Sequence, residues 1–354
     1  MIALVDVEAE LALFTEGIAG QYYHIKPASE FSSRRIELPP DQAALAMDTV
    51  YVPESMDHPD PSAYRVVVMQ QLGLREFGTL TFNIGVARAR IPALAELEMP
   101  THRVRESDFS VFFQHVELPR VLSRLFTCCE RARVVARLLV RYPGLERHLR
   151  RFRDVQHAGY LPFAITDLPA LIDAFDVAAD GLHRDLLVDA TGLLEPALAR
   201  LDRLLQSGAD VYDAAAIAFD LYQRWTTELD YPAAEILDEQ RNVPEDALEW
   251  MQREARLEDW EESLESMEQS LQLQMPEGAE VDAVASDNLE DASIREQQID
   301  IRSLSDERDN LKRRLDMERS AIRDALGPVK PTARSYRYDE WDYLHHRYLR
   351  HFCR

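Results

Sequence analysis

Cysteine is scarce in this sequence, and its scarcity limits how the fold can be held together. Only three cysteines occur among 354 residues, at positions 128, 129 and 353. Cys128 and Cys129 are neighbours on a predicted helix, so their side chains point in different directions and make a poor disulfide pair. Folds without disulfides are typical of reducing compartments, and we therefore expect a cytoplasmic protein.

Segments that direct a chain to a membrane are also missing. The first residues, MIALVDVEAELALF, carry acids where a secretory signal carries lysine or arginine. No apolar run approaches the roughly 20 residues that a membrane-spanning helix needs. We therefore expect a soluble protein with no membrane insertion.

The common signatures of catalysis are absent, and positive charge is scarce. The sequence contains no Ser-His-Asp spacing, Walker loop, GxGxxG or HExxH. We therefore expect no enzyme activity, no catalytic residue and no cofactor. Lysine and arginine together number 40 against 63 acids, which gives a net charge of −23. A chain so negative repels a polyanion, which argues against non-specific binding of nucleic acid.

Helical periodicity dominates residues 1–230, which we predict to be one all-helical domain. Residues 21–61 are rich in proline and predict loops with a short strand at 49–52, and residues 79–107 predict a connector. Capping residues support two of the helices, Asp167 with Pro169 for one and Asp210 for the other. Gly192 and Pro196 predict a kink or a split. The predicted helices cover residues 4–19, 62–78, 145–156, 167–179, 183–206 and 210–229, together with the central stretch 112–145.

The central stretch has an apolar face and an arginine face, and it stops at Pro143 and Gly144. The arginine face contains Arg120, Arg124, Arg131, Arg133, Arg137 and Arg141, with Glu130 as the lone acid. These arginines either pair with acids elsewhere in the fold or form a docking face for an acidic partner or for the chain's own acidic segment. Glu130 with Arg133 predicts a buried or half-buried ion pair that holds helices together, more than a catalytic pair.

The remainder of the chain predicts three further parts. Residues 231–292 read as an acidic linker with short helices around Trp250 and Trp260, because residues 245–291 contain sixteen acids against Arg253 and Arg256. Residues 293–327 predict a long helix or coiled-coil-like arm, because apolar residues recur at close to heptad spacing. Residues 328–354 hold an aromatic segment. The predicted fold class is thus mostly α, with a helical N-terminal domain, an acidic linker, a long helical arm and a C-terminal aromatic segment.

Four stretches, in this order, resemble one protein family. They are residues 64–79, ending in EFGT; residues 125–145, ending in RYPGL; the acidic middle; and YDEWDY at 338–343, followed by Tyr348 and Cys353. In this order they resemble the nitric oxide reductase activation proteins of the NorD type, whose relatives include the Rubisco-activating CbbO proteins. Two positions depart from that pattern: Arg131 stands where an acid is more usual, and Phe352 stands where tryptophan is usual.

Members of that family continue into a von Willebrand A domain, whose metal site begins with an Asp-x-Ser-x-Ser motif. This sequence contains no such motif and stops at Arg354, about where that domain would begin. The resemblance therefore implies a member that is truncated or that does without this domain. No metal site is carried over.

The resemblance implies a non-enzymatic adaptor that couples a MoxR-type AAA+ ATPase to a client metalloenzyme such as nitric oxide reductase, or to a Rubisco-like client. The acidic middle would then be a flexible tether. Two alternatives are a chelatase-like subunit that handles metal through the acidic segment and His345, His346 and His351, and a structural helical scaffold. The predicted partner-binding residues are Arg120, Arg124, Glu130, Arg133, Arg137, Arg141, Tyr338, Asp339, Glu340, Trp341 and Asp342.

Overall fold

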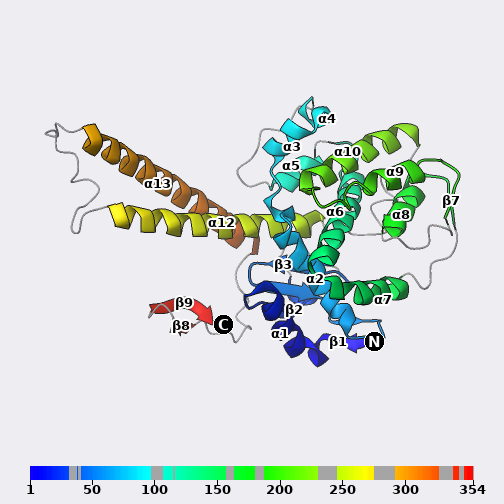
Figure 1. The fold of residues 1–354 in the computed structure, drawn as a ribbon, viewed down its shortest axis with the longest axis horizontal. Coiled ribbons are helices and arrows are strands. Elements are labelled where there is room, and N and C mark those ends of the chain that lie inside the picture. The colour runs from blue at the N-terminus through cyan, green and yellow to red at the C-terminus, as the bar shows by residue number, and fades with distance from the viewer. Residues whose placement is uncertain are drawn as a thin grey trace.

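A globular body and a projecting helical arm make up most of the described chain (Figure 1). In this computed structural model the described residues are 1–31, 38, 41–96, 107–114, 116–156, 163–179, 187–229, 245–274, 292–326, 338–342 and 347–353. The chain is mostly helical, as predicted, with small sheets between the helices. None of the helices in these ranges combines the length and the apolar character needed to cross a membrane.

Ten α-helices form the body within those ranges. The helices that agree best with the periodicity are α2, α7, α8 and α10, whose bounds lie within two residues of the predicted ones. The bounds are α1 Glu8–Ala19, α2 Ser62–Glu76, α3 Ile84–Arg90, α4 Pro92–Ala95, α5 Asp108–Gln114, α6 Pro119–Arg141, α7 Glu146–Gln156, α8 Leu168–Ala179, α9 Leu194–Leu201 and α10 Val211–Glu228.

Helix α6 lies at the centre of the body and packs against α2, α8 and α10. Pro119 occupies its first turn, where the missing N–H costs nothing, and the helix ends at Arg141 before Pro143. Its apolar positions recur every three or four residues, so Leu122, Phe126 and Cys129 are fully buried. Cys128 and Cys129 are both free and buried, in agreement with the prediction that they make a poor disulfide pair.

Two capping predictions are confirmed. The Asp167 side chain accepts a hydrogen bond from the Ala170 N–H at 2.9 Å at the start of α8. The Asp210 carboxylate accepts from the Tyr212 and Asp213 N–H groups, while the Asp213 side chain accepts from the Asp210 N–H, which completes a capping box. Each cap satisfies N–H groups that the first turn of a helix cannot satisfy by itself.

The prediction that residues 1–230 are all helical is wrong in detail, because short strands form small sheets there. One sheet has the order β2-β4-β3, with β2 parallel and β3 antiparallel to β4, and two others pair β1 with β5 and β6 with β7. The predicted strand at 49–52 is β4. The bounds are β1 Ile2–Ala3, β2 His24–Pro27, β3 Ala44–Ala46, β4 Thr49–Val52, β5 Ser55–Met56, β6 Phe163–Ile165 and β7 Leu187–Asp189.

Three other element predictions are corrected. Residues 79–107, predicted as a connector, contain the 3₁₀ turn Thr79–Thr81 and helices α3 and α4. The predicted helix at 183–206 is instead strand β7 followed by α9, so the break near Gly192 is a change of element. The central stretch begins as a separate helix, α5, which ends before α6 starts at Pro119. In each case tertiary contacts determine the secondary structure of a segment that is too short to show a clear periodicity.

The acidic linker prediction is also wrong where the chain is described, because residues 245–274 form one continuous helix. This helix, α12 (Glu245–Gln274), runs outward from the body, and α13 (Ala292–Leu326) returns along it, as Figure 1 shows. The predicted long helix at 293–327 is therefore confirmed as the second half of a helical hairpin. Charge pairs and an aromatic side chain join its two halves. Arg253 pairs with Glu318 and Arg319 with Glu261, and the Arg314 guanidinium lies 4.6 Å from the centre of the Trp260 ring.

The YDEWD sequence forms strand β8 (Tyr338–Asp342), which pairs antiparallel with β9 (Arg347–Cys353). In this register Trp341 lies opposite Tyr348, and Glu340 lies opposite Leu349. The aromatic segment is therefore a β-hairpin, a structure that the sequence motif alone did not predict.

Gly73 provides a test of the close packing between α2 and α6. A Cβ atom at this position would lie 2.7 Å from Val134 Cγ1 and 3.3 Å from Leu138 Cδ1, closer than packed side chains allow. We expect Gly73→Ala to lower the free energy of unfolding by about 1–3 kcal/mol, as overpacking does. Urea denaturation measures this change.

Gly17 in α1 is the matched control, because a Cβ atom there meets nothing within 4 Å. Gly17→Ala should raise the free energy of unfolding by about 0.5–1 kcal/mol, since alanine is the better helix former. Equal effects of the two substitutions would contradict the close approach of α2 and α6.

Candidate functional site

The arginine face of α6 is mostly occupied by contacts within the fold. Arg124 pairs with Asp173 at 2.7 Å and Arg131 with Asp176 at 2.6 Å, both acids lying on α8. Arg137 donates a hydrogen bond to the Ala209 carbonyl at 2.6 Å, and Arg141 lies 3.5 Å from a Glu76 oxygen. The interpretation that these arginines pair with acids elsewhere in the fold is therefore confirmed for Arg124, Arg131 and Arg141. Arg120 is exposed in the first turn of α6.

Glu130 and Arg133 form a buried ion pair, as the sequence predicted, and each is only 2% exposed. The Arg133 guanidinium donates two hydrogen bonds to the Glu130 carboxylate, at 2.7 and 2.5 Å, and a third to the Phe77 carbonyl at 3.0 Å. The Thr79 hydroxyl donates to Glu130 at 2.5 Å. The pair therefore joins α6 to the end of α2. A partner cannot touch either side chain in this fold. The prediction that Glu130 and Arg133 belong to a docking face is therefore wrong.

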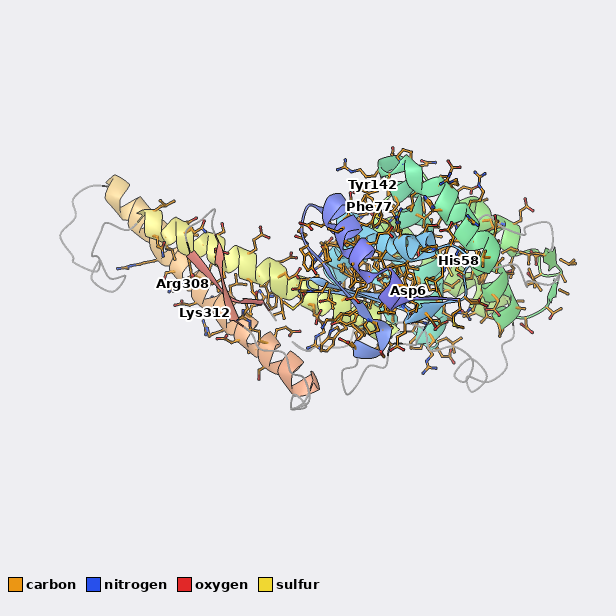
Figure 2. All side chains as sticks on the ribbon, turned by 90° about the horizontal axis from the view of Figure 1, so that it is seen from below. Asp6, His58, Phe77, Tyr142, Arg308 and Lys312 are labelled. Atoms are coloured by element: carbon orange, nitrogen blue, oxygen red, sulfur yellow. The ribbon has the colours of Figure 1, made fainter. Side chains whose placement is uncertain are left out.

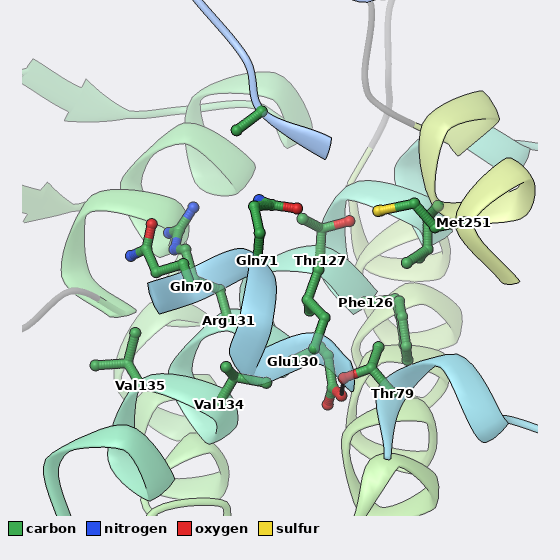
Figure 3. Close-up of a pocket in the computed structure, with 13 residues that line it drawn as sticks. Gln70, Gln71, Thr79, Phe126, Thr127, Glu130, Arg131, Val134, Val135 and Met251 are labelled. Atoms are coloured by element: carbon green, nitrogen blue, oxygen red, sulfur yellow. Dashed lines mark hydrogen bonds between the residues drawn. The ribbon is translucent and has the colours of Figure 1, made fainter. Parts of the chain in front are cut away.

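A mostly apolar cavity of about 130 Å³ lies beside this ion pair, between α2, α6 and the base of α12 (Figure 3). Phe126, Val134 and Met251 supply apolar walls, and Glu130 and Thr79 lie hydrogen-bonded at its edge. The Gln71 side-chain oxygen is buried and has no hydrogen-bond partner. The cavity is therefore a small volume with apolar walls and one hydrogen-bonded pair, Thr79 with Glu130, at its edge.

The base of the arm is anchored in the body by buried residues of α12. Trp250 and Met251 belong to the main hydrophobic core. Gln252, 2% exposed, accepts from the Phe109 N–H at 3.1 Å and donates to the Phe82 carbonyl at 2.7 Å. Sequence reasoning missed these residues, because the dense acids around them indicated a linker. The apolar positions 247, 248, 250 and 251 were the signal that could have revealed a buried helix.

Glu254, at the junction of the arm and the body, has a carboxyl group whose environment disfavours the ionised form. Burial, together with the nearby Asp48 carboxylate, raises the pKa of Glu254 to about 7. A hydrogen bond from the Trp250 indole N–H, at 2.8 Å, and the charge of Arg75 act in the opposite direction on the same pKa. Arg75 itself pairs with Glu258 and donates to the Met47 carbonyl at 3.0 Å. Charged residues of the arm, Arg75 and Asp48 in the turn before β4 therefore interact as one cluster.

The other residues proposed as functional lie in the C-terminal hairpin or beyond the described ranges. Tyr338, Asp339, Glu340, Trp341 and Asp342 form β8, whose described pairing is with β9. His345 and His346 lie outside the described residues, and His351 is in β9. In the described portion of the chain, no three His, Cys, Asp or Glu side chains gather as a metal site would require.

Comparison with protein-family models, with curated proteins and with solved structures gave no match for this chain. The resemblance to the NorD-type family therefore stays a prediction that rests on its four sequence stretches.

The buried ion pair gives a stability prediction. Arg133→Met leaves the Glu130 carboxylate buried without its partner, and we expect a loss of about 3–5 kcal/mol in the free energy of unfolding. Arg150→Met removes an exposed ion pair with Glu146 and should change the free energy of unfolding by no more than about 0.5 kcal/mol. Urea denaturation followed by circular dichroism measures both, and a small effect at Arg133 would show that the pair is not desolvated.

Glu254 gives a pH prediction. Its folded pKa lies above the usual value of 4.5, so folding favours the protonated carboxyl. The free energy of unfolding should therefore fall as pH rises from about 4.5 to about 7, by roughly 3 kcal/mol from this group. Glu254→Gln keeps an acceptor for Trp250 and should be more stable than the parent at pH 8, with the difference disappearing near pH 4.5.

Glu262→Gln is the control for this measurement, because Glu262 is exposed on the same helix. Urea denaturation at pH 5 and pH 8 should show little pH-dependent difference between this variant and the parent. The same pH dependence in the Glu254→Gln variant and the parent would overturn the assignment.

Proposed function

We propose that this protein is a non-enzymatic adaptor that works with a MoxR-type AAA+ ATPase to remodel or activate a client metalloenzyme of the nitric oxide reductase type or a Rubisco-like client. The resemblance supplies the class of partner. The observation that carries the proposal is the helical hairpin of α12 and α13, which stands clear of the body in two views (Figures 1 and 2). A packed body with a projecting arm suits a protein that links two others.

The arm presents charge of both signs to a partner. Asp259, Glu262 and Glu268 are exposed along α12, while Arg302, Lys312 and Arg313 are exposed along α13. Leu257 and Leu315 of the hairpin are buried, while Leu273 and Met317 are exposed on it. Charged partner surfaces accelerate encounter and select a partner more than they add affinity, as a transient adaptor requires.

Most arginines of α6 are held by contacts within the fold. We therefore place the proposed docking surface on the arm and no longer on the arginine face of α6. Charge reversal at Arg133 would unfold the body and so cannot report on docking. The YDEWD strand β8, residues 338–342, stays part of the proposed partner surface.

Charge reversal on the arm tests the proposal. Asp259, Glu262 and Glu268, all changed to Lys, should weaken co-purification with the MoxR-type ATPase of the same cell at least about tenfold, because the partner-facing charge is inverted. ATP turnover measured with and without the protein supplies a second readout. The same charge change at Glu16, Glu195 and Asp202, exposed on the body, is the control.

Equal binding of the ATPase by the two triple variants would show that the arm is not part of the interface. No complex between the parent protein and the ATPase would overturn the adaptor proposal.

A further inference from the structure

Three helices supply the walls of the cavity between the body and the base of the arm (Figure 3). Phe126, Glu130 and Val134 line it from α6, and their four-residue spacing places them on one face of that helix. Residues of α2 form a second wall, and Leu248 and Met251 of α12 line the cavity from the arm. The cavity therefore lies where the arm joins the body.

The volume of the cavity suits a molecule about the size of one aromatic ring. It measures about 130 Å³, and a cavity of about 150 Å³ with apolar walls binds benzene. Phe126, Val134 and Leu248 are buried apolar residues of its walls. Walls of this kind favour a ligand whose own surface is mostly apolar, because such a surface leaves water readily.

Gln71 adds one hydrogen-bond acceptor to these walls. Figure 3 shows Gln71 of α2 beside Thr127 of α6, both among the lining residues. The Gln71 Oε1 atom is buried and receives no hydrogen bond from the described part of the chain. Buried polar atoms are nearly always paired in folded proteins. A ligand with one O–H or N–H group would supply the donor.

The charged residues at the cavity favour a neutral ligand. The Glu130 carboxylate accepts hydrogen bonds from Arg133 and from the Thr79 hydroxyl, at 2.5 Å each. Arg131, which also lines the cavity, pairs with Asp176 at 2.6 Å. Both charges are therefore balanced within the fold. A charged ligand would leave water without gaining a counter-ion, which is costly.

We infer that this cavity binds a small, neutral and mostly apolar molecule, whose single O–H or N–H group donates a hydrogen bond to Gln71 Oε1. Phenol is a simple molecule with these features. The inference concerns the cavity alone and does not depend on the ATPase partnership.

Such a ligand would contact the arm as well as the body. Met251 of α12 lines the cavity, and its Sδ atom accepts a hydrogen bond from the Leu45 N–H of β3 at 3.1 Å. The complete cavity exists only while Leu248 and Met251 are docked in the body. A ligand that binds this state stabilises it, so the ligand would hold the base of the arm in place.

Two probes of similar shape test the inference on the full chain. Phenol carries the donor, and toluene carries a methyl group in place of the hydroxyl. Isothermal titration calorimetry should show saturable binding of phenol to the parent protein. In Gln71→Met the ratio of phenol affinity to toluene affinity should fall at least about tenfold, because only phenol loses a hydrogen bond.

The matched control for this ratio is Gln223→Met, because Gln223 is exposed on α10. It should leave the ratio at the parent value. Each ratio compares two probes on one variant, so a change in the stability of that variant affects both probes alike.

A second pair of variants places the probes in the cavity. Ala43 is a lining residue, and Ala43→Leu should weaken binding of both probes at least about tenfold, because the larger side chain occupies part of the volume. Ala19→Leu, exposed on α1 away from the cavity, should leave binding unchanged.

Hydrogen exchange tests the link to the arm. Saturating phenol should slow exchange of the backbone amide hydrogens of residues 247–252 at least about threefold, because it stabilises the docked base of α12. Residues 264–270, farther along the same helix, should change less. Unchanged exchange at residues 247–252 would overturn the link between the ligand and the arm.

Absence of saturable phenol binding to the parent would overturn the inference. An unchanged affinity ratio in Gln71→Met would overturn it as well, since the ligand would then make no hydrogen bond with Gln71. Equal binding by Ala43→Leu and the parent would show that the probes attach elsewhere, and would also overturn it.

Discussion

The buried ion pair of Glu130 and Arg133 is the constraint on which the body depends. Two opposite charges are removed from water inside α6, and this is tolerable because the Arg133 guanidinium also satisfies the Phe77 carbonyl and the Thr79 hydroxyl supports Glu130. These bonds fix the end of α2 against α6. The helices α8 and α10 then pack on the other sides of α6, so its position determines theirs.

The arm depends on that arrangement in turn. Its base enters the core through Trp250 and Met251, and the polar atoms of Gln252 are satisfied by backbone groups of Phe82 and Phe109. The many acids of α12 are spread along the exposed hairpin. There, water and the basic residues of α13 reduce the repulsion between them. Glu254, which enters the body, is the exception, and its raised pKa is the consequence.

The small β2-β4-β3 sheet lies beside the base of the arm. One edge is closed by Met251 of the arm, and β2 at the other edge packs against α1. The turn before β4, which contains Met47 and Asp48, shares Arg75 with the arm.

The sequence by itself determined the long helices of the body, because apolar spacing and caps such as Asp167 and Asp210 are local features. It also determined that Glu130 and Arg133 would pair, since residues three apart share a helix face. Apart from β4, which the sequence predicted, only the tertiary structure decided the strands of two to four residues, which are too short for alternation to show. It also decided the helix α12, whose acids indicated a linker. For α12 the decision came from burial of a few apolar residues against the body and from pairing with α13, and both are contacts with segments distant in sequence. The position of β2 at the edge of its sheet was likewise decided by strand order, which no local pattern contains.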